Sequence, residues 1–298
     1  MQNKGVDFTK LQVTTLIATF FSLWLAVYFE HAVENVLAYI LILSFGMLHG
    51  ANDIKLLQVE AKKKSKPYDF FRIIAYYIGF VLSVAALFYL FPSIALGLFI
   101  LFSAYHFGEQ HWISKINGSP LFLLFFYTAY GLVILFLLFA AHSAQVSEII
   151  FDIIGIYINQ TYYRFIFVIS FIILVILYIT KFKQNKINIF LELFYLLVFF
   201  IIFNTASLLW AFAIFFILWH AIPSLGDQIS YLYGDLSRKN FIKYLRSSVI
   251  YWLASVITLI ILFFFIDGSS AGFIPFFFSF LAAITFPHVL VISGLNKS

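Results

Sequence analysis

Long unbroken apolar runs dominate the chain, and their length predicts membrane-spanning helices. The hydrocarbon core of a bilayer is about 30 Å thick and needs about 20 residues of helix. The runs do not alternate apolar and polar residues, so the pattern favours helices over the strands of a barrel. We expect one all-α transmembrane domain over residues 1–298, a polytopic helix bundle. Its ten predicted spans cover residues 11–28, 33–49, 70–91, 93–112, 121–141, 162–180, 187–203, 206–222, 249–266 and 273–293.

The composition agrees with a membrane protein. Hydrophobic residues make up 63% of the chain and charged residues only 10%, whereas a soluble domain has about 25% charged residues. The chain contains no cysteine. Disulfides and thiolate metal sites are therefore excluded, and any metal must be held by nitrogen or oxygen ligands.

Basic residues fall on alternate sides of the predicted spans. If the N-terminus is cytoplasmic, seventeen of the eighteen lysines and arginines lie inside and only Arg164 lies outside. This asymmetry is typical of membrane orientation rather than of nucleic-acid binding. It predicts a multi-pass inner-membrane protein with both termini cytoplasmic. The inside residues are Lys4, Lys10, Lys55, Lys62, Lys63, Lys64, Lys66, Arg72, Lys115, Lys181, Lys183, Lys186, Arg238, Lys239, Lys243, Arg246 and Lys297.

Four histidines share one predicted depth. Each lies on a span that runs inward, 13 to 16 residues after the span begins, or about 20 Å below the outer surface at about 1.5 Å per residue. One such residue is explained by a hydrogen bond to a neighbouring helix, but four at one level predict a layer. Imidazole suits iron, copper and zinc. The predicted ligands are His49, His106, His220 and His288.

The fourth ligand has an alternative. His111 comes five residues after His106, about 140° around a helix, so both cannot easily reach one metal. His288 shares the depth of the other three, and we favour it over His111. His31 and His142 lie at the outer ends of spans, where an imidazole needs no special role.

Two carboxylates and two aromatic residues accompany these histidines. Asp53 follows His49 by four residues and Glu109 follows His106 by three, so each is a candidate to accept the second ring proton of a ligand. An equally good interpretation is that Asp53 and Glu109 are charges at the membrane interface. Tyr105 and Trp219 precede His106 and His220 and could line the site of a long apolar substrate.

The motifs around the four histidines resemble those of the Brp/Blh-type carotene 15,15′-oxygenases of bacteria and archaea. They occur in that family's order over most of the chain, with Ser224 where some members carry a further histidine. The matching segments are Met47–Asp53, Ser103–Glu109, Leu218–Pro223 and Phe286–Val291.

The resemblance implies an integral membrane enzyme that uses Fe(II) and O2 to split β-carotene at its central double bond. The product would be two molecules of retinal, usually supplied to a retinal-binding rhodopsin. One other class stays open, and a second is disfavoured. A transporter could use intramembrane histidines to relay protons or bind a cation. A two-iron desaturase or hydroxylase would need about eight clustered histidines, more than the five deep ones present.

Overall fold

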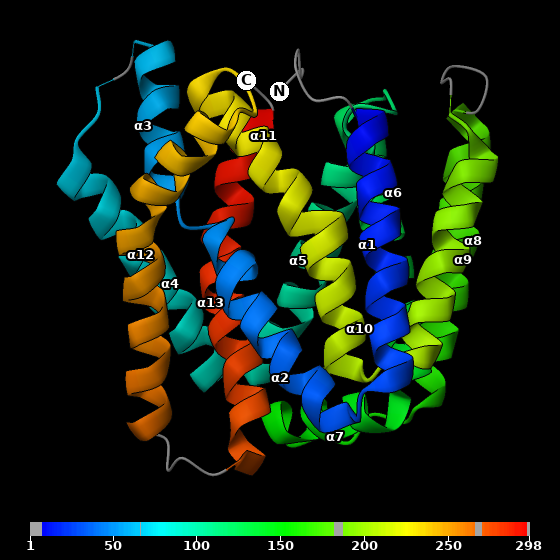
Figure 1. Ribbon diagram of the computed structural model, residues 1–298. Coiled ribbons are helices and arrows are strands. Elements are labelled where there is room, and N and C mark those ends of the chain that lie inside the picture. Colours follow the sequence, from blue (N-terminus) through cyan, green and yellow to red (C-terminus); the bar gives the residue numbers. More distant parts are fainter. Residues whose placement is uncertain (1–7, 66, 182–186, 266–269, 297–298) are drawn as a thin grey trace. The chain divides into compact units, whose positions relative to one another are not determined.

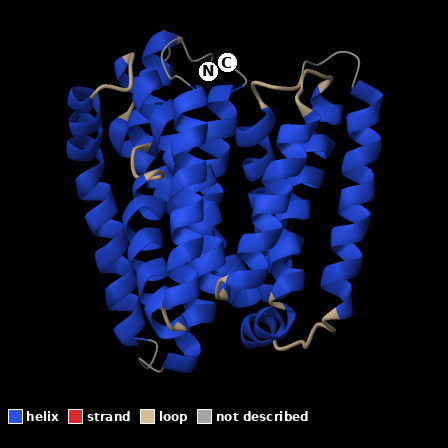
Figure 2. Ribbon diagram, turned by 45° about the vertical axis from the view of Figure 1, so that its right-hand side comes forward, coloured by secondary structure: helices blue, strands red, loops and turns tan. Residues whose placement is uncertain are grey.

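A computed structural model describes residues 8–65, 67–181, 187–265 and 270–296. Within these ranges all regular structure is helical (Figure 2). The expected all-α fold is therefore confirmed. Five basic residues of the orientation prediction lie outside the described ranges, namely Lys4, Lys66, Lys183, Lys186 and Lys297.

The helices follow one another with short connections (Figure 1). The first part of the chain forms α1 (Phe8–Tyr28), α2 (His31–Leu41), the π-helix η1 (Ile42–Gly46), α3 (Asp53–Lys63), α4 (Phe70–Leu90) and α5 (Pro92–Trp112). The middle forms α6 (Pro120–Ala141), α7 (Ser143–Ile154), α8 (Thr161–Lys181) and α9 (Ile189–Thr205). The last part forms α10 (Leu208–Ile214), the π-helix η3 (Phe215–Ala221), α11 (Ile222–Tyr233), α12 (Arg238–Phe265) and α13 (Ser270–Asn296).

Each of the ten predicted spans coincides with a helix or with a continuous helical run. In the described residues, seven runs are long and apolar enough to cross a membrane, and the runs His31–Gly46 and Ile189–Thr205 are shorter apolar helices. The remaining predicted span, residues 93–112, corresponds to the 21-residue helix α5. The chain is thus a polytopic α-helical membrane protein.

Two predicted boundaries are wrong. The eighth span does not end at Ile222, because η3 continues directly into α11 and the run reaches Tyr233. Pro223 lies in the first turn of α11, directly after the junction with η3. The ninth span does not begin at Val249, because the apolar helix α12 already begins at Arg238.

Two amphipathic helices lie where the hydrophobic pattern predicts connections. The first, α3, takes the place of the basic loop and buries Ile54 and Leu56, while Lys62 and Lys63 occupy its last turn. The second, α7, buries Val146 and Ile150. With 11 and 12 residues, α3 and α7 are both too short to cross the hydrocarbon core of a bilayer.

The described chain divides into two compact units. Unit 1 comprises residues 1–16, 40–96 and 221–298, and unit 2 comprises residues 17–39 and 97–220. The single transmembrane domain expected from the sequence stays a prediction.

In unit 1, α13 packs against α4 and α3. Leu56 of α3 lies in a buried cluster with Val291, Ile292 and Leu295 of α13. The first turn of α1 and the last turn of α13 lie at the same end of unit 1 (Figure 1).

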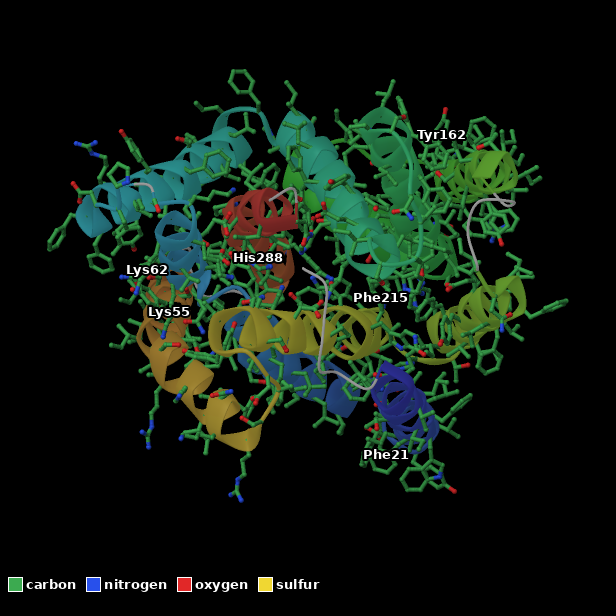
Figure 3. The ribbon with its side chains drawn as sticks, turned by 90° about the horizontal axis from the view of Figure 1, so that it is seen from above. Phe21, Lys55, Lys62, Tyr162, Phe215 and His288 are labelled. Carbon is green, nitrogen blue, oxygen red and sulfur yellow. The ribbon has the colours of Figure 1, made fainter. Side chains whose placement is uncertain are left out.

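In unit 2, α6 is the central helix and packs against α8 and α9. Most of its second half is buried, from Tyr127 to Leu138. Phe21 and Tyr162 instead point outward, each 58% exposed (Figure 3). A helix surface that presents bare aromatic rings is expected where lipid replaces water as the solvent.

Candidate functional site

Irregular helical turns accompany two of the four deep histidines. In unit 1, η1 is followed by two α-helical residues and then by a turn over residues 49–52, which begins at His49. In unit 2, η3 carries His220 near its end. A π-helix adds a residue to a turn and redirects the side chains after it, and such turns are frequent at functional sites. Hydrophobic periodicity carries no signal for them.

Unit 1 brings His49 and His288 together. Their ring centres are 4.7 Å apart and the rings are nearly perpendicular, at 85°. Both side chains are buried, with residue exposures of 6% and 2%. Gly50 lies against the His288 ring, since a Cβ built on it would be 3.6 Å from Nδ1. Figure 3 shows His288 on α13, with Lys55 and Lys62 on the neighbouring helix α3.

An oxygen atom accepts the Nδ1 proton of each of these imidazoles. His49 Nδ1 donates to the carbonyl of Gly46, and His288 Nδ1 donates to Asp53 Oδ1 over 2.8 Å. A proton held on Nδ1 leaves the lone pair of the neutral ring on Nε2. Both rings therefore have the tautomer in which Nε2 can bind a metal.

Asp53 occupies a different place from the one expected. The sequence prediction put it one turn after His49 on a continuing helix, but the helix gives way to the turn at residues 49–52, and Asp53 begins α3. Its carboxylate instead accepts from His288 and, through Oδ2, from the hydroxyl of Tyr77 over 2.8 Å. Asp53 is buried within the protein, with only 1% of its surface exposed.

A buried polar network holds the backbone of His49. The amide of Gln228 donates to the His49 carbonyl over 2.7 Å and lies 3.1 Å from the Ser224 hydroxyl. Tyr244 donates to the side-chain oxygen of Gln228 over 2.8 Å. Ser224 is therefore one hydrogen bond away from the group that fixes His49. Sequence reasoning missed Gln228 and Tyr244, because their contacts are made across the fold.

Unit 2 brings His106 and His220 together in the same way. Their ring centres are 4.7 Å apart at an angle of 75°, and the residues are 1% and 2% exposed. Aromatic rings surround His220, with Phe107 at 4.7 Å and Phe216 stacked at 5.6 Å. The side chain of Gln110 donates to the His220 carbonyl over 3.0 Å.

Two glycines bring α5 and α6 into backbone contact beside His106. A Cβ on Gly108 would lie 2.0 Å from the carbonyl oxygen of Tyr127, and one on Gly131 would lie 1.9 Å from that of Ala104. No side chain fits at either distance, so only glycine allows this approach. Small residues at such crossings are a common means of packing helices in membranes.

The remaining predicted residues lie in unit 2. Glu109 is buried, 3% exposed, and accepts from the Tyr105 hydroxyl over 2.8 Å. Trp219 donates to the Thr19 hydroxyl over 3.0 Å, and its ring packs on Phe199 with centres 4.8 Å apart. Their roles in metal or substrate binding stay predictions.

His111 belongs to a separate ionic cluster. Its Nε2 lies 2.7 Å from Glu192 Oε2 and 2.9 Å from the ammonium of Lys115. Lys115 also donates to Glu192 Oε1 over 2.8 Å, and the His111 ring stacks on Tyr130. The nitrogen that would bind a metal is thus engaged by charged neighbours, which supports His288 over His111.

The donor chemistry of the two histidine pairs fits a transition metal. Two imidazoles bound side by side to one ion, each through a nitrogen about 2.1 Å away, have ring centres about 5 Å apart. Each pair is close to that separation, and in unit 1 the tautomer is already fixed. Within the described ranges, no group of three His, Cys, Asp or Glu residues is arranged to hold a metal ion. Neither pair alone therefore completes a site.

Comparisons with known proteins point to one family. A family model described as beta-carotene 15,15'-dioxygenase matches residues 40–296, which is most of the chain. Searches of curated proteins and of solved structures found no match. The matched range contains both histidine pairs.

Proposed function

The chain belongs to the beta-carotene 15,15'-dioxygenase family, and on that premise we propose that it is an Fe(II)-dependent enzyme that cleaves β-carotene with O2. The cut would fall at the central 15,15′ double bond and release two molecules of retinal. One observation carries the proposal. In each unit, two buried imidazoles lie with ring centres 4.7 Å apart, in segments that the family model matches.

The proposed iron ligands are the four deep histidines. Imidazole is a suitable ligand for iron, and four neutral rings bring no negative charge into the bilayer. When bound, Fe(II) would supply the oxygen chemistry, while the protein supplies orientation and a dry environment. The ligands are His49, His106, His220 and His288.

The surrounding residues orient these ligands and exclude water. Asp53 and the Gly46 carbonyl hold protons on the Nδ1 atoms of His288 and His49. In unit 2, Phe107 and Phe216 cover His220. A long polyene would approach sideways from the lipid, where β-carotene dissolves.

Retinal formation tests the function. Bacterial cells that make β-carotene would express the chain, and their extracts would be assayed for retinal and for remaining carotene. The wild type is expected to convert carotene to retinal, and alanine at any of the four ligands should abolish conversion. His31→Ala is the matched control, because its side chain is 77% exposed. Carotene left intact by a well-expressed wild type would contradict the proposal.

Metal analysis tests the ligand set. The purified wild type should hold one iron per chain, and His288→Ala should lose it. His111→Ala should keep the iron, because His111 lies in its own ionic cluster. Loss of iron from His111→Ala with retention in His288→Ala would reverse the assignment. A transporter need not retain iron through washing, so an iron-free wild type would favour that class.

The proposed location is the inner membrane, with both termini and α3 on the cytoplasmic side. The support is the excess of lysine and arginine in the inside segments. Reporter fusions after Lys64 and at the C-terminus should both be cytoplasmic. A periplasmic reporter at Lys64 would overturn the orientation. The retinal would then be released within reach of a retinal-binding rhodopsin in the same membrane.

A further inference from the structure

Tyr77 of α4 is the second hydrogen-bond donor to the carboxylate behind His288. Its hydroxyl donates to Asp53 Oδ2, and His288 Nδ1 donates to Oδ1, both over 2.8 Å. Each carboxylate oxygen therefore has its own donor. The three residues come from three helices of unit 1, namely α4, α3 and α13.

The surroundings make this arrangement rigid. Asp53 is 1% exposed and His288 is 2% exposed, so water contributes little to either group. The Tyr77 ring is partly buried and packs against the cluster that contains Leu56 and Val291. Charge-assisted hydrogen bonds are strong in such a low-dielectric setting, and each one restricts the rotation of the carboxylate.

We propose that Tyr77 is a positioning residue that acts on His288 through Asp53. With its hydroxyl on Oδ2, the carboxylate is held in the rotation that presents Oδ1 to Nδ1 of His288. The proton of the ring then stays on Nδ1 and the lone pair stays on Nε2. Without the hydroxyl, the carboxylate is free to turn, and the ring loses the constraint on its tautomer.

The effect of Tyr77 on metal affinity rests on the proposed function, but its effect on the tautomer of His288 does not. A carboxylate hydrogen-bonded to a ligand histidine fixes the ring orientation and raises its basicity, and loss of such a group typically weakens metal affinity about 10- to 100-fold. Tyr77 acts one step further from the ligand. Its loss should therefore weaken affinity by about tenfold, at the lower end of that range.

The tautomer is measured first, on metal-free protein. Nitrogen-15 NMR of histidine-labelled protein in lipid distinguishes Nδ1–H from Nε2–H rings, and His288→Ala identifies the signals of this residue. In the wild type, His288 should be protonated on Nδ1 alone. In Tyr77→Phe, a second population protonated on Nε2 should appear. Phenylalanine keeps the ring that packs on α13, so the variant removes only the hydroxyl.

Tyr76→Phe is the matched control, because Tyr76 is next to Tyr77 in the chain but is 70% exposed. This substitution should leave the spectrum unchanged. Asp53→Asn provides a second route to the same result, since it alters the acceptor directly and should also give a mixed tautomer. A pure Nδ1–H signal for His288 in Tyr77→Phe would overturn the inference.

Metal affinity is measured second, with Co(II) as the probe. Tyr77→Phe should bind Co(II) about tenfold more weakly than the wild type. The same change should have no further effect in an Asp53→Asn background, because the two residues act in series. If His288→Ala binds Co(II) as well as the wild type does, the proposed ligand set fails, while the tautomer result stands. If His288→Ala loses binding but Tyr77→Phe does not, the inference alone fails.

Discussion

The two histidine pairs have the same separation but are held by different means. In unit 1, hydrogen bonds fix the pair, since Asp53 and the Gly46 carbonyl accept from the two rings. In unit 2, aromatic rings and a close helix crossing surround the pair, with Phe107 and Phe216 against His220. Unit 1 is thus suited to control which ring nitrogen of its histidines carries the proton and what charge lies beside it. Unit 2 is suited to control the position of its histidine rings through the shape of their surroundings.

This difference predicts that the two units respond to different substitutions. Removal of a polar group should act on metal affinity in unit 1 with little loss of stability. A change of side-chain volume should act on folding in unit 2. The predictions below follow this division, from the largest expected effect to the smallest.

Gly131→Ala should give the largest effect, a loss of about 3 kcal/mol of stability or more, because the added Cβ would lie 1.9 Å from a backbone oxygen of α5. The two helices must separate to admit it. Thermal unfolding in detergent measures the loss. Gly97→Ala on α5 is the control, since nothing lies within 4 Å of its Cβ, and alanine there should be neutral or favourable by about 1 kcal/mol. Equal melting temperatures for Gly131→Ala and the wild type would show that the crossing is not tight.

Asp53→Asn should weaken metal affinity about 10- to 100-fold while the protein stays folded. The amide has nearly the same size, but it no longer attracts the Nδ1 proton of His288 as a carboxylate does. Titration with Co(II) measures the affinity, and thermal unfolding checks the fold. Asp152→Asn on the exposed side of α7 is the control. An unchanged affinity would mean that unit 1 does not tune its ligand through charge.

Glu192→Gln should cost about 1–3 kcal/mol of stability and leave the iron content unchanged. Burial lowers the pKa of Lys115, and Glu192 opposes that effect, so the variant leaves a poorly solvated ammonium beside His111. The full cost of breaking a buried pair is about 3–5 kcal/mol, but Lys115 is 25% exposed and water offsets part of it. Thermal unfolding and metal analysis test both parts. Loss of iron in this variant would tie His111 to the metal centre.

The sequence was sufficient for the helical membrane fold, because each span is a long apolar run whose length matches the bilayer. It was also sufficient to single out the histidines that lie in pairs, since an imidazole at membrane depth is costly and therefore conspicuous. The helix α3 was missed because its basic end reads as a loop, although Leu56 and Ile54 make it amphipathic.

The hydrogen-bond partners could not be predicted. The sequence suggested that Asp53 accepts the ring proton of His49, on the assumption of a continuous helix. The turn at residues 49–52 instead directs the carboxylate toward His288. Tyr77 and Gln228 reach the site from helices far away in the chain. No local spacing encodes such contacts, because they arise only when the helices pack.

Trp219→Phe should have the smallest effect, and it decides whether Trp219 packs unit 2 or contacts the substrate. The indole N–H donates to the Thr19 hydroxyl over 3.0 Å, and the ring lies against Phe199 and Tyr195. Phenylalanine keeps most of the ring contact and loses one hydrogen bond, a cost of about 0.6–1 kcal/mol in a membrane protein. Thr19→Val in the same experiment should cost a similar amount, and the double variant should cost little more than either single one. If Trp219 only packs the unit, the carotene concentration for half-maximal conversion stays the same in all three variants. A rise of that concentration in Trp219→Phe but not in Thr19→Val would place the indole at the substrate instead.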